Sequence, residues 1–268
     1  MNQWRDVWLI AIATLMLISL LFIFKGHVPP VNKEKEPPVQ QENGQQEKDH
    51  ERKDKVIWGI DSASSANEQQ YRCVAENFGE PKVWGRYLGD LEGASVGLSV
   101  KEAEYLHAND IKILLIYNHV TDARGHKSGF SHAEKAASLA DELGVPKEKA
   151  IFVDIEPDYP VDSDFIKGWM EGMENSGYHA GIYGVFSEEQ DLYHVFKEMV
   201  ESDEKLESKM IVWTAHPQTG ISTQANAPEY KPEAPDGANV LGWQYGIDAK
   251  SCNIDTNLFK GEIIDYLW

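Results

Sequence analysis

The chain has few residues of the kinds that several enzyme classes require. It contains two cysteines, Cys73 and Cys252, and neither has an adjacent base that would activate it as a nucleophile. The G-x-S-x-G motif is absent, so acyl transfer is not expected. Basic residues are scarce, because 25 Lys and Arg stand against 44 Asp and Glu, which gives a net charge of −19. This acidity argues against nucleic acid or an anionic membrane surface as the main partner.

The amino-terminal segment differs from the rest of the chain. Residues 8–24 are apolar except for Thr14 and Ser19 and carry no charge. This length is near the lower limit for a helix that spans a bilayer. The stretch Leu21–Phe24 offers no small residues for signal-peptide cleavage, so an uncleaved anchor is favoured over a cleaved signal or a buried core helix. We predict a cytoplasmic tail at residues 1–7 and a transmembrane signal anchor at residues 8–25.

A polar segment separates this anchor from the remainder. It is rich in Lys, Glu, Gln and Pro and cannot bury enough apolar surface to order itself. We therefore predict a disordered polar linker at residues 26–55 and one domain at residues 56–268. The domain would be extracytoplasmic on a single-pass protein of the cell membrane, since it follows a single amino-terminal segment. In that oxidising compartment Cys73 and Cys252 could pair, although two free thiols are also compatible with the sequence.

Short apolar runs alternate with helical stretches throughout the predicted domain. The eight runs, read as strands, are residues 56–61, 82–88, 111–118, 150–156, 179–184, 210–215, 240–245 and 252–255. Helical spacing between them is clearest at Ser131–Leu143, and Asp162 and Ser187 are suitable caps for the two helices that follow. The count predicts an α/β fold, a (β/α)8 TIM-like barrel.

An open doubly wound sheet is the alternative architecture. It loses weight because no glycine-rich phosphate loop follows the first predicted strand. In a closed barrel the first and last strands are neighbours, which makes pairing of Cys73 with Cys252 geometrically plausible. Residues 222–237 hold three prolines and show no helical period, so we expect a long loop there.

The run Ala150–Pro157 carries the most informative motif. Its apolar residues predict a strand buried on both faces, and the strand ends in Asp154 and Glu156. Residues i and i+2 of a strand point to the same side, so the two carboxyl groups should lie close together. Two like charges at such a distance push their pKa values apart. This is how one fold obtains a proton donor beside an ionised carboxylate.

Active sites of β/α barrels lie at the carboxyl ends of the strands. The residues expected there are Asp61, Tyr87, Asn118, Asp154, Glu156, Tyr183, Trp213, Gln244, Tyr245 and Asp255. Acids and aromatic residues dominate this set. Aromatic faces stack on sugar rings, and amides and phenols bind sugar hydroxyls. A ring of acids without Cys and His is unsuited to zinc, although it could hold Mg²⁺ or Ca²⁺. We expect no metal and no cofactor.

The motifs resemble those of a known superfamily. Asp61, the Asp154-x-Glu156 pair, the segment Trp243-Gln244-Tyr245 and Asp255-x-Asn257 are similar to features of the family-25 glycoside hydrolases. Those are β/α-barrel muramidases that cut peptidoglycan between N-acetylmuramic acid and N-acetylglucosamine. The segments 58–63 and 84–89 look closer to a sister group of bacterial secreted proteins. That group is the glycoside-hydrolase-like domain of unknown function number 1906.

The resemblance implies roles for particular residues. Glu156 would be the general acid, and Asp154 the paired carboxylate that acts electrostatically or orients the substrate's N-acetyl group. Asp61 and Asp255 match the further acids of the family. The resemblance thus implies a lysozyme-like glycosidase whose partner is peptidoglycan or another envelope polysaccharide. The alternative is a catalytically inactive barrel that binds glycan or scaffolds envelope assembly, because fold does not dictate function.

Overall fold

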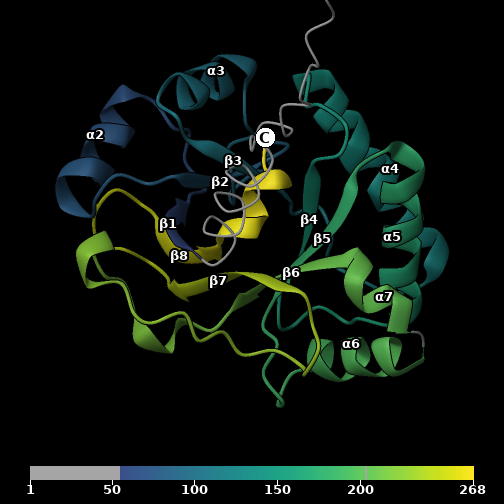
Figure 1. The fold of residues 1–268 in the computed structure, drawn as a ribbon. Helices are drawn as coiled ribbons and strands as arrows, with labels where there is room; N and C mark the ends of the chain where they lie inside the picture. Colours follow the sequence, from purple (N-terminus) through teal and green to yellow (C-terminus); the bar gives the residue numbers. More distant parts are fainter. Residues whose placement is uncertain (1–54, 203) are drawn as a thin grey trace, which may run out of the picture. The chain divides into compact units, whose positions relative to one another are not determined.

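The computed structural model describes residues 55–202 and 204–268, which contain a closed barrel of eight strands (Figure 1). The strands are β1 (Val56–Asp61), β2 (Val83–Tyr87), β3 (Lys112–Tyr117), β4 (Ala150–Ile155), β5 (His179–Gly184), β6 (Met210–Ala215), β7 (Val240–Gly246) and β8 (Asp255–Lys260). Hydrogen bonds join them in sequence order, and β1 closes the ring against β8. The closed, TIM-like α/β barrel is therefore confirmed.

The eighth strand differs from the prediction in both position and direction. It begins at Asp255 rather than at Cys252, and it runs antiparallel to both β7 and β1, whereas the other neighbouring pairs are parallel. The reason is the connection: residues 247–254 contain no helix. A parallel crossover needs a dozen or more residues, so a connection this short can only reverse the chain.

Helices lie outside the ring of strands (Figure 1). They are α2 (Glu68–Asn77), α3 (Val100–Ala108), α4 (His126–Leu143), α5 (Ser163–Ser176), α6 (Asp191–Ser202) and α7 (Glu204–Lys209). Asp162 caps α5 as predicted, because its side chain accepts a hydrogen bond from the Phe165 N–H. The predicted cap at Ser187 is wrong, since α6 begins only at Asp191. The predicted long loop at residues 222–237 holds one short 3₁₀ turn, Gln224–Asn226.

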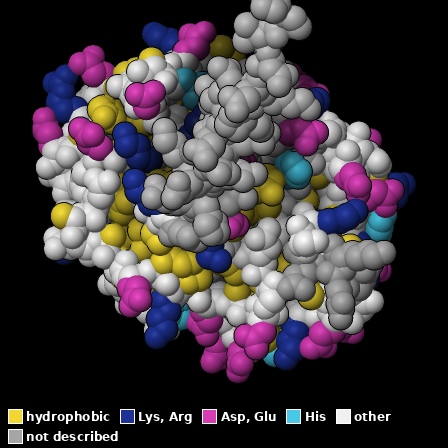
Figure 2. Space-filling model, in the orientation of Figure 1, with side chains coloured by type: hydrophobic (Ala, Val, Ile, Leu, Met, Phe, Trp, Pro, Cys, Tyr) yellow, Lys and Arg dark blue, Asp and Glu magenta, His cyan; other side chains and the backbone are white. Residues whose placement is uncertain are grey.

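The carboxyl-terminal residues close the amino-terminal end of the barrel. A 3₁₀ turn at Gly261–Asp265 follows β8, and Ile263 and Leu267 are fully buried in the core cluster that fills the barrel. The carbonyl of Trp268 accepts a hydrogen bond of 2.9 Å from the Ile113 N–H, at the beginning of β3. Figure 1 shows this segment in the middle of the ring, and Figure 2 shows acidic and basic side chains interspersed around the same face. A site inside the barrel must therefore open at the other end.

A disulfide joins the first and last parts of the barrel. Cys73 on α2 is bonded to Cys252 in the loop before β8, with 5.7 Å between their Cα atoms. The side-chain amide of Gln70, on the same helix, donates to the carbonyl of Cys252. This loop leads directly to Asp255, so the disulfide fixes the segment that carries one of the predicted site acids.

The predicted amino-terminal tail, anchor and nearly all of the predicted linker lie outside the described residues. Within the part that is described, no helix combines the length and the apolar character needed to cross a bilayer.

Candidate active site

Asp61 is the last residue of β1 and lies inside the mouth of the barrel. Its carboxyl group is buried, and Oδ2 accepts hydrogen bonds from Gln244 Nε2 at 3.0 Å and from Asn257 Nδ2 at 2.7 Å. Gly85 on the neighbouring strand makes room for it, because a Cβ there would stand 2.6 Å from the Asp61 Cβ. Burial raises the pKa of Asp61, while the two amides and the charge of Arg86 lower it. The net effect is a raised pKa, because burial outweighs the three groups that favour the ionised form.

Asp154 lies at the end of β4, and Glu156 comes directly after the last residue of this strand, as the D-x-E motif predicted. Asp154 is 6% exposed, and its Oδ1 has no hydrogen-bond partner among the described residues. Burial, followed by the charges of Glu156 and Asp61, raises its pKa well above the usual range. Glu156 lies nearer the solvent and is half-buried. Burial and the charge of Asp158 raise its pKa as well. The pair therefore retains protons to higher pH than ordinary carboxyl groups do.

Asp255 completes the group of acids because β8 runs antiparallel. A strand that enters the barrel from the open end begins there, so Asp255 pairs directly with Asp61 in the β1–β8 register. Its Oδ1 accepts a hydrogen bond of 2.7 Å from the Asp248 N–H, and its Oδ2 lies 3.3 Å from Gln244 Nε2. Burial and the neighbouring charge of Asp61 raise the pKa of Asp255 to about 7. All four predicted acids thus lie at one end of the barrel.

Aromatic residues and one amide surround these acids. The hydroxyl of Tyr183 donates to Gln244 Oε1 at 2.7 Å, and its ring centroid lies 4.3 Å from that of Trp213. Tyr87 is half-buried at the end of β2. Burial and the four acids raise the pKa of its phenol. Trp213 is 1% exposed and lies within the core of the barrel, so it supports the site from below and offers no exposed face for a sugar ring.

Two predicted binding residues have other contacts. Tyr245 belongs to the core between sheet and helices, is 0% exposed, and accepts a hydrogen bond from Trp58 Nε1 at 3.0 Å. The prediction that Tyr245 lies at the site is therefore wrong. Strand alternation explains the error, since Gln244 points inward and its neighbour must point outward. Asn118 follows β3, and its Nδ2 donates to Ser95 Oγ at 3.0 Å.

Asn257 is a site residue that the candidate set omitted. It is fully buried on β8, donates from Nδ2 to Asp61, and accepts a hydrogen bond of 2.8 Å from Trp213 Nε1 at its Oδ1. Asn257 therefore links Asp61 to Trp213. Its spacing of two from Asp255 places both on the same face of the strand, and this signal was available in the sequence.

The arrangement suits proton transfer better than metal binding. In residues 55–202 and 204–268, no group of three or more His, Cys, Asp and Glu side chains is placed to hold a metal ion. Several carboxyl groups with raised pKa values can instead supply both a proton donor and a negative charge at one site.

A barrel with such acids at its open end is typical of glycoside hydrolase-like proteins. The chain belongs to the family of Rv2525c-like, glycoside hydrolase-like domains, whose sequence profile matches residues 81–257. The family predicted from the sequence is thereby confirmed. No curated protein matches the chain significantly.

Solved structures extend this result. An uncharacterized protein from B. stearothermophilus is 37% identical, with a TM-score of 0.77, over 79% of this chain and 100% of that chain. The spore cortex lytic enzyme SleM from Clostridium perfringens shares the fold at 12% identity and a TM-score of 0.53, over 77% of this chain and 68% of that chain. A family 25 glycosyl hydrolase from Bacillus anthracis is more distant, at 15% identity and a TM-score of 0.39, over 76% of this chain and 88% of that chain.

Proposed function

We propose that this protein is a glycosidase that hydrolyses cell-wall glycan, with Glu156 as the general acid. The observation that carries the proposal is the convergence of four carboxyl groups at the open end of the barrel, where burial raises their pKa values. Glycoside cleavage needs a protonated acid beside the leaving oxygen and negative charge beside the sugar ring, and this cluster contains candidates for both.

Glu156 is better placed than Asp154 to donate a proton. It lies beyond the end of β4 and is half-buried, whereas Asp154 is almost fully enclosed. A donor must reach the glycosidic oxygen, and it must still hold its proton near neutral pH. The burial that raises the pKa of Glu156 favours the second condition. The buried neighbour Asp154 would orient the substrate's acetamido group while it holds its proton, or stabilise positive charge on the ring once it is ionised.

Asp61 and Asp255 would act through their charge. Both contact the same amide nitrogen of Gln244, and Asp61 has a second donor in Asn257. Fixed amide donors stabilise the ionised form of a carboxyl group without reorganising during the reaction. We assign to these acids the stabilisation of the oxocarbenium-like transition state.

The proposed substrate is peptidoglycan or another envelope polysaccharide. This is supported by the fold shared with a spore cortex lytic enzyme and by membership of a glycoside hydrolase-like family. We further propose that the barrel works outside the cytoplasm, tethered by the amino-terminal segment. The Cys73–Cys252 disulfide supports an oxidising compartment, where such bonds persist.

The test is the release of reducing sugars from purified peptidoglycan by residues 55–268. This fragment is a reasonable unit, because the B. stearothermophilus protein is covered along its full length by 79% of this chain. Release by the wild type and by Glu142→Gln, an exposed acid of α4, together with loss of release in Glu156→Gln, would support the proposal. No release by the folded wild type would favour the inactive, glycan-binding alternative.

A further inference from the structure

A buried ion pair lies directly behind the acid cluster, on the outer side of the barrel wall. Arg86 is 0% exposed on β2, and its Nε lies 2.6 Å from Oε1 of Glu102 on α3. Arg86 immediately precedes Tyr87, and among the residues that the structure describes it is the cation whose charge acts on Asp61. The pair thus lies next to two strands that supply site residues.

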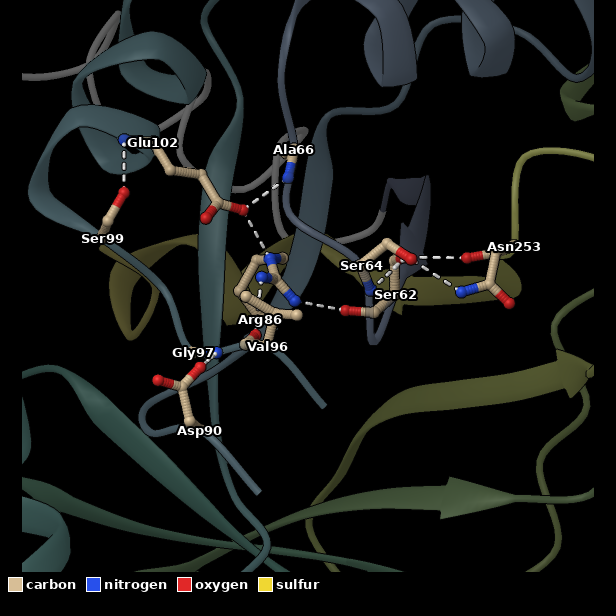
Figure 3. Close-up of polar contacts among 10 residues, drawn as sticks. All are labelled: Ser62, Ser64, Ala66, Arg86, Asp90, Val96, Gly97, Ser99, Glu102 and Asn253. Atoms are coloured by element: carbon tan, nitrogen blue, oxygen red, sulfur yellow. Dashed lines mark hydrogen bonds and ion pairs between the residues drawn. The ribbon is translucent and has the colours of Figure 1, made fainter. Parts of the chain in front are cut away.

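The same pair holds two loops of the open end (Figure 3). Arg86 Nη1 donates to the carbonyl of Ser62, and Nη2 donates to the carbonyl of Val96 at 2.9 Å. Glu102 Oε1 also accepts a hydrogen bond of 2.6 Å from the Ala66 N–H. Ser62 follows Asp61 directly, so a shift of the guanidinium would move the backbone that positions this acid.

The first of these loops is joined in turn to the loop before β8. Ser62 Oγ donates to the carbonyl of Asn253 at 2.7 Å, and Asn253 Nδ2 donates to Ser64 Oγ at 2.8 Å (Figure 3). Asn253 lies two residues before Asp255. A continuous set of contacts therefore runs from Arg86 to both acids of the β1–β8 pair.

Stability alone is a poor explanation for this pair. Removing two charges from water is costly, and replacing a buried ion pair with apolar residues of similar size is often neutral or stabilising. The geometry, by contrast, puts a permanent positive charge next to the strand end that carries Asp61, and this charge acts on the Asp61 carboxyl group. Opposite charge at short range favours the ionised form of a carboxyl group.

We propose that Arg86 is a positioning residue for the acid cluster: it fixes the loop after Asp61 and favours the charged form of that carboxyl group, while Glu102 weakens this electrostatic effect by pairing with the guanidinium. The assignment of this cluster as a glycosidase site rests on the proposed function, but the effect of Arg86 on the Asp61 carboxyl group does not. Inside the barrel mouth the charge of Asp61 acts on Asp154, Asp255, Tyr87 and Tyr183, and from the outer side of the wall the charge of Arg86 acts on Asp61.

The test measures the pKa of Asp61 directly, by carboxyl ¹³C NMR titration of residues 55–268. Glu102→Gln keeps the acceptor oxygen but removes the counter-charge, so the pKa of Asp61 should fall. Arg86→Met combined with Glu102→Met removes both charges without leaving either unpaired, so the pKa should rise. If the ion pair only stabilised the fold, the two variants would not shift the pKa of Asp61 in opposite directions. Equal shifts in both variants, or none, would overturn the proposal.

Two further variants keep the test decisive. Arg86→Lys retains the charge but cannot reach Ser62 and Val96 together, so it should leave the pKa of Asp61 close to its wild-type value and lower glycan turnover. Glu104→Gln, an exposed acid of the same helix, is the matched control and should change neither. If the double variant does not fold, Glu102→Gln still decides, since an unchanged or raised pKa contradicts the proposal.

Measurements of glycan cleavage separate the proposed function from the role of Arg86. If the wild type cleaves glycan, the acidic limb of its pH profile should move with the measured pKa of Asp61 in each variant. If the wild type is inactive while the pKa values shift in opposite directions, the proposed function fails and the role of Arg86 stands.

Discussion

Asp61 and Asp255 face each other across the antiparallel strands β1 and β8, and Gln244 Nε2 lies within 3.3 Å of a carboxyl oxygen of each. Two carboxyl groups in direct opposition repel unless a donor or a proton lies between them. Gln244 supplies that donor, and its Oε1 is in turn held by the Tyr183 hydroxyl. The side-chain amide of Gln244 therefore connects both acids to Tyr183.

Replacing this amide should damage both stability and activity. Gln244→Met removes a donor from both acids and leaves the Tyr183 hydroxyl without its acceptor. We expect a loss of about 1–3 kcal/mol in the free energy of unfolding, as is usual when buried polar groups lose partners. Urea unfolding near pH 7 measures it, with the exposed Gln218→Met as control. A loss no larger than the control's would contradict this reading of Gln244.

The pH dependence of stability should report Asp154. Its pKa is raised in the folded protein, so the folded state binds more protons than the unfolded state. The stability it contributes is complete below the unfolded pKa, near 4, and is lost as the pH rises through the folded value. Asp154→Asn should therefore stabilise the barrel near pH 8, by about 1–3 kcal/mol, and much less near pH 4. Thermal unfolding across this range would show the difference, and a variant that is less stable near pH 8 would refute it.

Tyr183 and Tyr245 should respond differently to loss of their hydroxyl groups. Tyr183→Phe releases Gln244, and we expect glycan turnover to fall by about tenfold or more, the scale of a lost positioning contact. Tyr245→Phe breaks bonds to Trp58 and Ser222 in the core between sheet and helices, so it should cost about 1 kcal/mol of stability and leave turnover near the wild-type value. Equal effects of the two changes on turnover would mean that Tyr245 had been wrongly excluded from the site.

The disulfide should contribute to stability and to the alignment of Asp255. It closes a loop with a sequence separation of 179, for which chain entropy gives at most about 5 kcal/mol. We expect Cys73→Ser combined with Cys252→Ser to lower the midpoint of chemical unfolding and to reduce glycan turnover more than a distant change of equal cost. Unchanged stability in the double variant would show that the crosslink is dispensable.

Much of the barrel was predictable because its strands are short apolar runs of regular spacing. The direction of β8 was not read from the sequence, since the residues of Asp255–Lys260, which are buried except at the two ends, carry no sign of strand direction. The length of the loop before it was the available signal. The start of α6 was also misplaced, because Ser187 forms a turn whose carbonyl accepts the Gln190 N–H instead of beginning the helix.

The acids were predictable for a simple reason: each lies at the end of a strand near the open mouth of the barrel. The contacts between them were not, because Gln244 and Asn257 reach Asp61 from strands remote in sequence, and Trp213 is connected to it only through Asn257. Tyr245 was misassigned because the aromatic character of a strand end does not reveal which face it occupies. The Arg86–Glu102 pair was likewise invisible, since its partners come from separate elements.

The most direct test of this account is the chemistry of the chain ends that the barrel creates in peptidoglycan. Digests by wild-type residues 55–268 and by Glu156→Gln would be reduced with borohydride, and the new reducing ends identified by mass spectrometry. The account predicts reduced muramic acid ends with the wild type and none with the variant. Digests in which the folded wild type creates no new reducing ends, or in which Glu156→Gln creates as many, would contradict it.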